Sequence, residues 1–232
     1  MRHIAEALRC FTIGGCITVT TVCDPQQNCH ADKCAAVMSN FGSIHDTLRE
    51  TIHDALCGAN IRTASRMAEL LGDVNPMARA LDLGSACGSA SRFLAQTHDC
   101  QVVALNQSEE ENARARRLNT QQGLASQIEV VTGNYKDIPY GDSAFEVVWS
   151  QDAGLQPHAL AEVARVLQYG GKFVFAGTVQ GESNEATTPQ DVFPRGFYAH
   201  EARKAGMREM SHEEVTPRLV QQCRSALEAI VQ

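Results

Sequence analysis

The chain has 232 residues and a mass of 25.2 kDa, enough to bury the core of one domain. It is acidic, with a formal net charge of -7 and a pI of about 5.6. This balance argues against a broad nucleic-acid-binding face, because such a face needs clustered Lys and Arg side chains.

The basic cluster in NARARRLN, formed by Arg114, Arg116 and Arg117, is interpreted as the solvated face of a helix. No apolar run approaches the roughly 20 residues that span a bilayer. The start of the chain is basic, but the stretch after it lacks the Leu-rich centre of an export signal. We therefore expect a cytoplasmic protein that binds neither nucleic acid nor a membrane.

Nine cysteines occur, five of them among the first 34 residues, and none of these five forms a C-x-x-C pair. Zinc sites usually bring their ligands in such close pairs, so Cys29, His30 and Cys34 in CHADKC are a weak metal candidate. An odd number of cysteines without a convincing export signal predicts free thiols in a reducing compartment, and we expect no bound metal.

Residues 45–72 carry apolar side chains at helical intervals, which predicts two helices broken near Gly58. From residue 78 strands and helices alternate. Strands are expected at 78–84, 100–106, 127–134, 144–151 and 172–177, with helices at 88–98, 108–123 and 157–171. This order predicts an α/β fold: a doubly wound, mostly parallel, Rossmann-like sheet with helices on both faces.

After the last of these strands, residues 177–191 are rich in Gly, Ser, Thr and Asn and are expected to form a loop. A helix is expected at 196–207, where Gly206 stops it. Residues 208–215 are a possible strand, and residues 216–232 form a last amphipathic pattern typical of a helix.

The stretch ALDLGSACGSASRFLA runs from the first of these strands into a loop of very small residues. Asp82 is followed by Gly84, which can turn the chain sharply and let a ligand approach bare backbone. Gly88 lets the next helix pack closely, and the N-terminus of that helix offers donors to an electronegative group. Alone, a G-x-A-x-G pattern is common in nucleotide-binding loops but is sometimes only a tight turn.

Polar residues also end the next two strands. Asn106 stands where this architecture usually places the residue that touches a ribose, commonly a carboxylate. Asn134 can bond an adenine edge, with the aromatic face of Tyr135 beside it. A half-buried core aromatic is an equally good interpretation of Tyr135.

Taken together, LDLGSACG, GNYKDIPY, AFEVVW and ARVLQYGGKFVFAG resemble the class I S-adenosylmethionine-dependent methyltransferases over about residues 47–210. The chain departs from that pattern at Ala86, where a second glycine is usual, and at Asn106, where an acid is usual. The extra methyl of Ala86 is expected to be tolerated if its backbone angles are ordinary. The resemblance implies a methyltransferase domain over residues 47–232, after a divergent segment at 1–46.

Within that family, ALNQSEEENARARRLN and VVWSQDAGL are similar to the sarcosine/dimethylglycine N-methyltransferases, which make betaine. The resemblance implies S-adenosylmethionine as cofactor and a small amine as methyl acceptor. The implied cofactor residues are Asp82, Gly84, Ser85, Ala86 and Gly88 for the methionine part, Asn106 and Gln107 for the ribose, Asn134 and Tyr135 for adenine, and Ser150 and Gln151 near the sulfonium.

The acceptor amine must arrive unprotonated, which a nearby carboxylate could assist. Asp152 is the residue we expect beside the acceptor, with Gln151 next to it, although a loop-capping role for Asp152 is nearly as good an interpretation. His158 is interpreted as a first-turn helix residue. The loop before Pro157 is about three residues shorter than the resemblance leads us to expect, which leaves the acceptor open.

The family's sheet usually ends in an antiparallel hairpin, for which we see no segment after residue 215, so that hairpin is expected to be incomplete. The run CITVTTV, residues 16–22, is rich in β-branched residues. We expect it to pair at the open edge, or the edge to stay unpaired and favour a homodimer.

Three other functions remain open. Methyl transfer to an oxygen or to a lipid would use the same cofactor residues, because function lies in the acceptor pocket. An inactive cofactor-binding domain would explain the missing glycine and the short loop. A nicotinamide-dependent dehydrogenase would need a full G-x-G-x-x-G and an acid after the second strand, and the sequence has neither.

Overall fold

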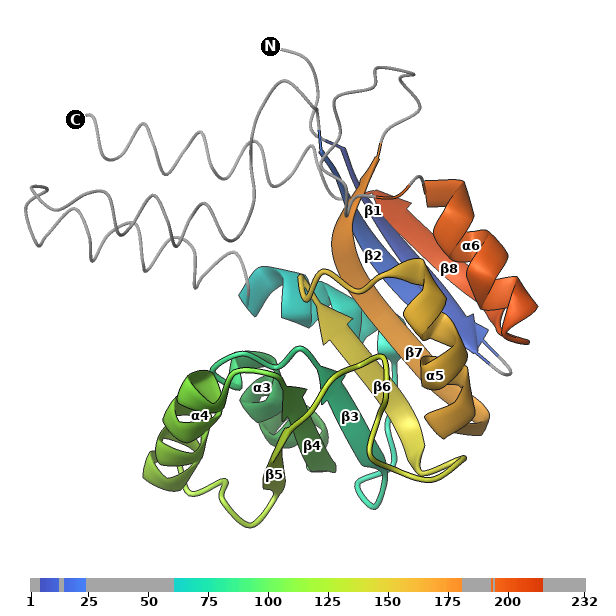
Figure 1. Ribbon diagram of the computed structural model, residues 1–232. Coiled ribbons are helices and arrows are strands. Elements are labelled where there is room, and N and C mark those ends of the chain that lie inside the picture. The colour runs from blue at the N-terminus through green and yellow to red at the C-terminus, as the bar shows by residue number, and fades with distance from the viewer. Residues whose placement is uncertain (1–4, 13–14, 24–60, 181–192, 194, 215–232) are drawn as a thin grey trace, which may run out of the picture.

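The computed structural model describes residues 5–12, 15–23, 61–180, 193 and 195–214 (Figure 1). Five parallel strands form one side of its sheet and end at the edge strand β5: β3 (Arg79–Leu83), β4 (Gln101–Asn106), β5 (Ile128–Thr132), β6 (Phe145–Gln151) and β7 (Leu167–Gln180). They lie in the order β7-β6-β3-β4-β5, and each neighbouring pair is parallel. The doubly wound α/β fold is confirmed.

Helices cover both faces of this sheet because successive strand residues point to opposite sides. The helix at 61–71 and α3 (Ser89–His98) pack on one face, where Met67, Leu94 and Trp149 are buried together. Helices α5 (Leu160–Val166) and α6 (Arg195–Lys204) pack on the other face with Leu81 and Tyr198. Helix α4 (Glu109–Gln121) begins at its cap Ser108 and contacts β5.

One boundary expected from the sequence is wrong. Residues 157–171 do not form one helix: a 3-10 turn, η1 (Pro157–Ala159), leads into α5, and β7 begins at Leu167. Gly170 has a φ of +80°, and a Cβ on Gly171 would lie 2.9 Å from the carbonyl oxygens of Gln168 and Glu146. The left-handed Gly170 and the close approach of β6 to Gly171 exclude a helix through these two residues, which lie within β7 instead.

The sheet continues beyond β7 with β2 (Gly15–Cys23), β8 (Arg208–Glu214) and β1 (Ala5–Thr12). Strand β2 pairs in parallel with both β7 and β8, and β1 pairs antiparallel with β2. The expectation that residues 16–22 pair at the open edge is confirmed, and so is the strand expected at 208–215.

Other expectations fall outside the described residues. They concern the cluster of Cys29, His30 and Cys34, the helix before Gly58, most of the loop at 177–191 and the helix at 216–232. Within the part of the chain that is described, no helix is both long and apolar enough to cross a membrane.

Candidate active site

The carboxyl ends of β3, β4, β5 and β6 meet at one edge of the sheet, and the order of the strands reverses between β3 and β6. Open α/β sheets bind their ligands at such a reversal, beyond the strand ends. The loops after β3 and β6 touch at this reversal, since a Cβ on Gly84, after β3, would lie 2.3 Å from the Cβ of Ala153, after β6. The sequence-predicted residues all lie at or just after the strand ends along this edge.

The loop after β3, residues 84–88, takes its shape from three left-handed residues. Gly84 has a φ of +74°, Ala86 of +45° and Gly88 of +77°. The condition stated for Ala86, ordinary backbone angles, is therefore not met: the residue adopts the left-handed conformation, which is strained for alanine and freely available to glycine. The amides of Gly84 and Ser85 both donate to the Leu105 carbonyl, at 2.9 and 3.2 Å, so they fasten the loop to β4.

Donors for a ligand remain at the start of α3. The N-cap of this helix is Gly88, and no side chain caps its first turn. The first amides of a helix need partners and favour an electronegative group. Ser85 adds a hydroxyl that is buried and makes no hydrogen bond. These free donors favour the interpretation of this loop as a binding site for a polar ligand over its interpretation as a simple turn.

Asp82 lies beneath this loop and is 1% exposed. The Ser91 hydroxyl donates to its carboxylate at 2.5 Å. Burial raises the pKa of Asp82 to about 6, although the bonds from Ser91 act in the opposite direction. A buried carboxylate with a raised pKa and no cationic partner among the described residues suggests a functional position.

At the end of β4 the structure adds a residue that the sequence interpretation missed. The amide of Asn106 donates to the Glu111 carboxylate at 2.8 Å, so an acid from α4 lies beside the position where the pattern usually has one. Ser108 accepts from the amide of Glu111 at 3.3 Å. The spacing S-x-x-E, which is typical of a capping box, was the available signal. Gln107 is exposed.

Two residues expected at adenine follow β5. The Asn134 side-chain oxygen accepts from the Lys136 amide at 2.9 Å and closes a turn, so the amide group of Asn134 is partly occupied. Tyr135 is half-buried and packs against the core, as the second interpretation predicted, while its hydroxyl donates to the Gly154 carbonyl at 3.3 Å. The loops after β5 and β6 are therefore in contact.

After β6, the buried Ser150 hydroxyl donates to the Leu83 carbonyl at 3.3 Å, so it joins β6 to β3. Gln151 is half-buried. Asp152 is exposed, has a φ of +52° and donates its amide to the Ala176 carbonyl at 2.8 Å. Desolvation by the surrounding protein raises the pKa of its carboxyl to about 6, an effect that solvent weakens at an exposed group. His158 is exposed on η1, as expected for a first-turn residue.

Comparison with known proteins agrees with this geometry. Residues 81–175 match the family described as "Methyltransferase domain". The sarcosine/dimethylglycine N-methyltransferase of Halorhodospira halochloris is 34% identical over 202 residues, which cover 82% of this chain and 72% of that protein. The glycine/sarcosine/dimethylglycine N-methyltransferase of Actinopolyspora halophila is 36% identical over 186 residues, which cover 75% of this chain and 33% of that protein.

Among solved structures, the geranyl diphosphate C-methyltransferase from Streptomyces coelicolor A3(2), in complex with Mg2+, geranyl diphosphate and S-adenosyl-L-homocysteine, has a TM-score of 0.56. The match covers 62% of this chain and 57% of that one, at 16% sequence identity, and so supports the fold alone.

The chain belongs to the class I S-adenosylmethionine-dependent methyltransferases, in the family that includes the sarcosine/dimethylglycine N-methyltransferases. It is a methyltransferase, and S-adenosylmethionine is its cofactor. The uncapped first turn of α3 and the unpaired hydroxyl of Ser85 fit the polar methionine end of that cofactor.

Proposed function

We propose that the protein transfers a methyl group from S-adenosylmethionine to a small amine such as sarcosine or dimethylglycine. The observation that carries this proposal is the likeness to two curated enzymes named for these amines, over 82% and 75% of this chain. The chain covers 72% of the first and 33% of the second, so the substrate is inferred from the shared part.

The cofactor site is proposed to lie across the strand ends. Asp82, Gly84, Ser85, Ala86 and Gly88 would hold the methionine part, Asn106 and Gln107 the ribose, Asn134 and Tyr135 the adenine, and Ser150 and Gln151 would lie near the sulfonium. Glu111 joins the ribose group in this proposal because its carboxylate is 2.8 Å from the Asn106 amide. A carboxylate accepts hydroxyl donors more strongly than an amide oxygen does.

When bound, the cofactor supplies a methyl group on a sulfonium that carries its own leaving group. The work left to the chain is to align the acceptor nitrogen, exclude water and take up the proton of an ammonium substrate. Asp152 is proposed to face the acceptor, with Gln151 beside it. A carboxylate at this position could accept the proton of an ammonium group.

The loop that carries Asp152 is held on both sides. The Tyr198 hydroxyl, from α6, donates to the Leu155 carbonyl at 2.8 Å, while the Tyr135 hydroxyl donates to the neighbouring Gly154 carbonyl. Two tyrosines from different parts of the chain thus fix successive peptide groups. A loop held in this way can present the Asp152 carboxylate in one place.

A two-step experiment tests the proposal. Calorimetric titration with S-adenosylhomocysteine should show binding, and Asn106→Ala should weaken it. Methyl transfer should then be measured with glycine, sarcosine and dimethylglycine, and we expect turnover with at least one of them. Binding without turnover of any amine would reject the amine acceptor and leave an oxygen or lipid acceptor, or an inactive cofactor-binding domain.

A further inference from the structure

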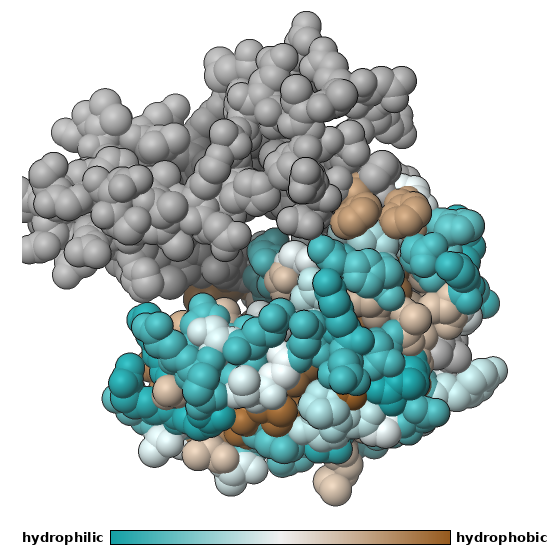
Figure 2. All heavy atoms as spheres, in the orientation of Figure 1, coloured by the Kyte–Doolittle hydropathy of each residue, from teal (hydrophilic) through white to brown (hydrophobic). Residues whose placement is uncertain are grey.

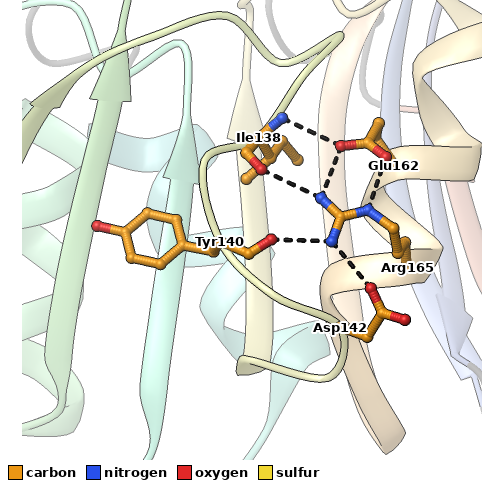
Figure 3. A network of polar contacts seen from close by, with 5 residues as sticks. All are labelled: Ile138, Tyr140, Asp142, Glu162 and Arg165. Atoms are coloured by element: carbon orange, nitrogen blue, oxygen red, sulfur yellow. Dashed lines mark hydrogen bonds and ion pairs between the residues drawn. The ribbon is translucent and has the colours of Figure 1, made fainter.

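One guanidinium ties the loop after β5 to helix α5 (Figure 3). Arg165 donates from Nε and Nη2 to the two oxygens of Glu162, at 2.7 and 2.8 Å. Its Nη1 donates to the Tyr140 carbonyl at 2.8 Å and to Asp142 at 3.0 Å, and Nη2 also reaches the Ile138 carbonyl at 3.1 Å. All three nitrogens of Arg165 are therefore engaged.

We call the ion pair of Arg165 and Glu162, with the loop groups that it binds, the clamp. Ile138 is bound by both members of this pair. Its carbonyl accepts from Arg165, and its amide donates to the Glu162 carboxylate at 3.0 Å, so the ion pair satisfies both polar groups of this residue. Its side chain is 2% exposed within the core. The amide of Ser143 donates back to the Arg165 carbonyl at 2.9 Å. The loop is fastened to α5 by backbone, charge and burial together.

The clamp lies next to the proposed adenine residues. At its start, the loop is fixed because the Gly133 amide donates to the Asn106 carbonyl at 3.1 Å, and a Cβ on Gly133 would lie 2.8 Å from Leu105. Further along the loop, Ile138 is fixed by its hydrogen bonds to Arg165 and Glu162. Asn134 and Tyr135 stand between these two anchors, so their positions depend on both.

The clamp keeps its charges at neutral pH. Hydrogen bonds from Arg165 hold the pKa of Glu162 below its usual value, and hydrogen bonds to Glu162 and then Asp142 raise the pKa of Arg165. A lysine would keep the charge but could not reproduce this planar fork of donors. The shape of the guanidinium is therefore what holds several loop groups at once.

The geometry points to Arg165 as a positioning residue for the adenine end of the cofactor site. It touches neither substrate nor cofactor and acts through the loop that carries Asn134 and Tyr135. This inference rests on the proposed placement of those two residues at adenine. Its consequence is that Arg165 controls how well the protein distinguishes adenine from another purine.

The test compares two ligands that differ in the purine edge, S-adenosylhomocysteine and S-inosylhomocysteine. The wild-type protein should prefer the adenosyl compound. Arg165→Gln should weaken S-adenosylhomocysteine binding by about tenfold, as expected for a displaced positioning group. The variant should also lose most of the preference, and its KM for S-adenosylmethionine should rise while kcat changes by less than about threefold. Destabilisation alone would not change the preference of the folded fraction.

Arg66→Gln is the matched control. Arg66 also joins two carboxylates, Glu69 and Glu213, and neither belongs to the loop after β5. This variant should keep the wild-type preference. Arg165→Lys serves if Arg165→Gln does not fold, and it should show a smaller loss of preference.

Two results would overturn the inference. Folded Arg165 variants with unchanged affinity and preference would show that the clamp does not position the adenine residues. A wild-type protein that binds both ligands equally would instead reject the placement of Asn134 and Tyr135 at adenine, and the inference would fail with that placement.

Discussion

Two loops that begin at the same edge of the sheet hold their shapes by different means. The loop at 84–88 has three left-handed residues, and its shape follows from the backbone. The loop at 133–143 is held from outside, by the side chains of Arg165 and Glu162 on a helix that follows it in the sequence (Figure 3).

Polar residues cover most of the described surface that is visible in the space-filling view, and an apolar patch lies low on the visible face (Figure 2).

The difference between the two loops determines how each responds to substitution. A backbone-shaped loop fails when a Cβ is added where none fits, whereas a clamped loop fails when a remote side chain is changed. The first kind is sensitive to steric volume and the second to hydrogen-bond geometry. The following substitutions separate the two behaviours.

The largest effect is expected from Gly84→Ala. The added Cβ would lie 2.3 Å from the Cβ of Ala153 and would also occupy a left-handed position. We expect a loss of stability of about 3 kcal/mol from strain and overpacking. S-adenosylhomocysteine binding, measured by calorimetry, should fall more than about a hundredfold, because the loops after β3 and β6 would have to separate.

Gly123→Ala controls for the strain. Gly123 has a φ of +73°, but nothing lies within 4 Å of its added Cβ. This variant should lose only about 1 kcal/mol of stability and keep its affinity for the ligand. Equal effects of the two substitutions would mean that strain, not contact with Ala153, governs the loop.

Asp82→Asn should change how stability depends on pH. The carboxyl titrates near 3.8 when unfolded and at about 6 when folded, so the folded state holds the proton more tightly in between. The contribution of Asp82 to the free energy of unfolding should therefore fall as pH rises from about 4 to about 6, by about 3 kcal/mol in total.

Denaturant titrations across this pH range would measure the slope. Asp82→Asn should remove this part of it and be more stable than the wild type above pH 6, while binding S-adenosylhomocysteine more weakly. Identical slopes for the two proteins would show that burial does not raise the pKa of Asp82.

Glu111→Gln tests the hydrogen bond between the side chains of Glu111 and Asn106 at the end of β4. The substitution keeps an acceptor for the Asn106 amide but removes the charge, so ribose binding should weaken by about tenfold. Calorimetry with S-adenosylhomocysteine measures the change. Glu110→Gln, an exposed neighbour in the same turn, should leave the affinity as it is; a similar loss there would point to the net charge of the helix start instead.

The smallest effect is expected from Ala86→Gly. It relieves a left-handed alanine but adds flexibility to the unfolded chain, so the net gain in stability should be about 0.5 kcal/mol. Ala161→Gly, at an exposed position within α5, should instead cost up to about 1 kcal/mol. Denaturation midpoints that moved in the same direction for both variants would contradict the strain at Ala86.

The fold was predictable because its signals are local. Alternating strand and helix patterns with Ser108 and Gly123 at helix ends follow from neighbouring residues alone. The helix expected at 157–171 was wrong because the decisive contact is remote: the Glu146 carbonyl approaches Gly171 from another strand. The periodicity of one segment cannot reveal a contact with a strand elsewhere in the sequence.

The candidate site also has residues that local signals predict and residues that depend on remote contacts. The residues at the strand ends, such as Asp82 and Asn106, could be placed from the motif because topology brings strand ends together. Glu111 was missed because its side chain turns back to the preceding strand, and the left-handed angle of Ala86 was missed because glycine is the usual marker of that conformation. The role proposed for Arg165 depends on the positions of four partners, which the sequence does not provide.

The pairing of β2 with β7 joins Gly15 to Lys172, so the two partners are far apart in the order of synthesis. A ribosome adding about 5–20 residues per second needs on the order of ten seconds to pass from one to the other. During that interval the run CITVTTV has no β7 beside it and is open to pairing with other nascent chains. Slower translation between these strands should therefore lower the yield of correctly folded protein.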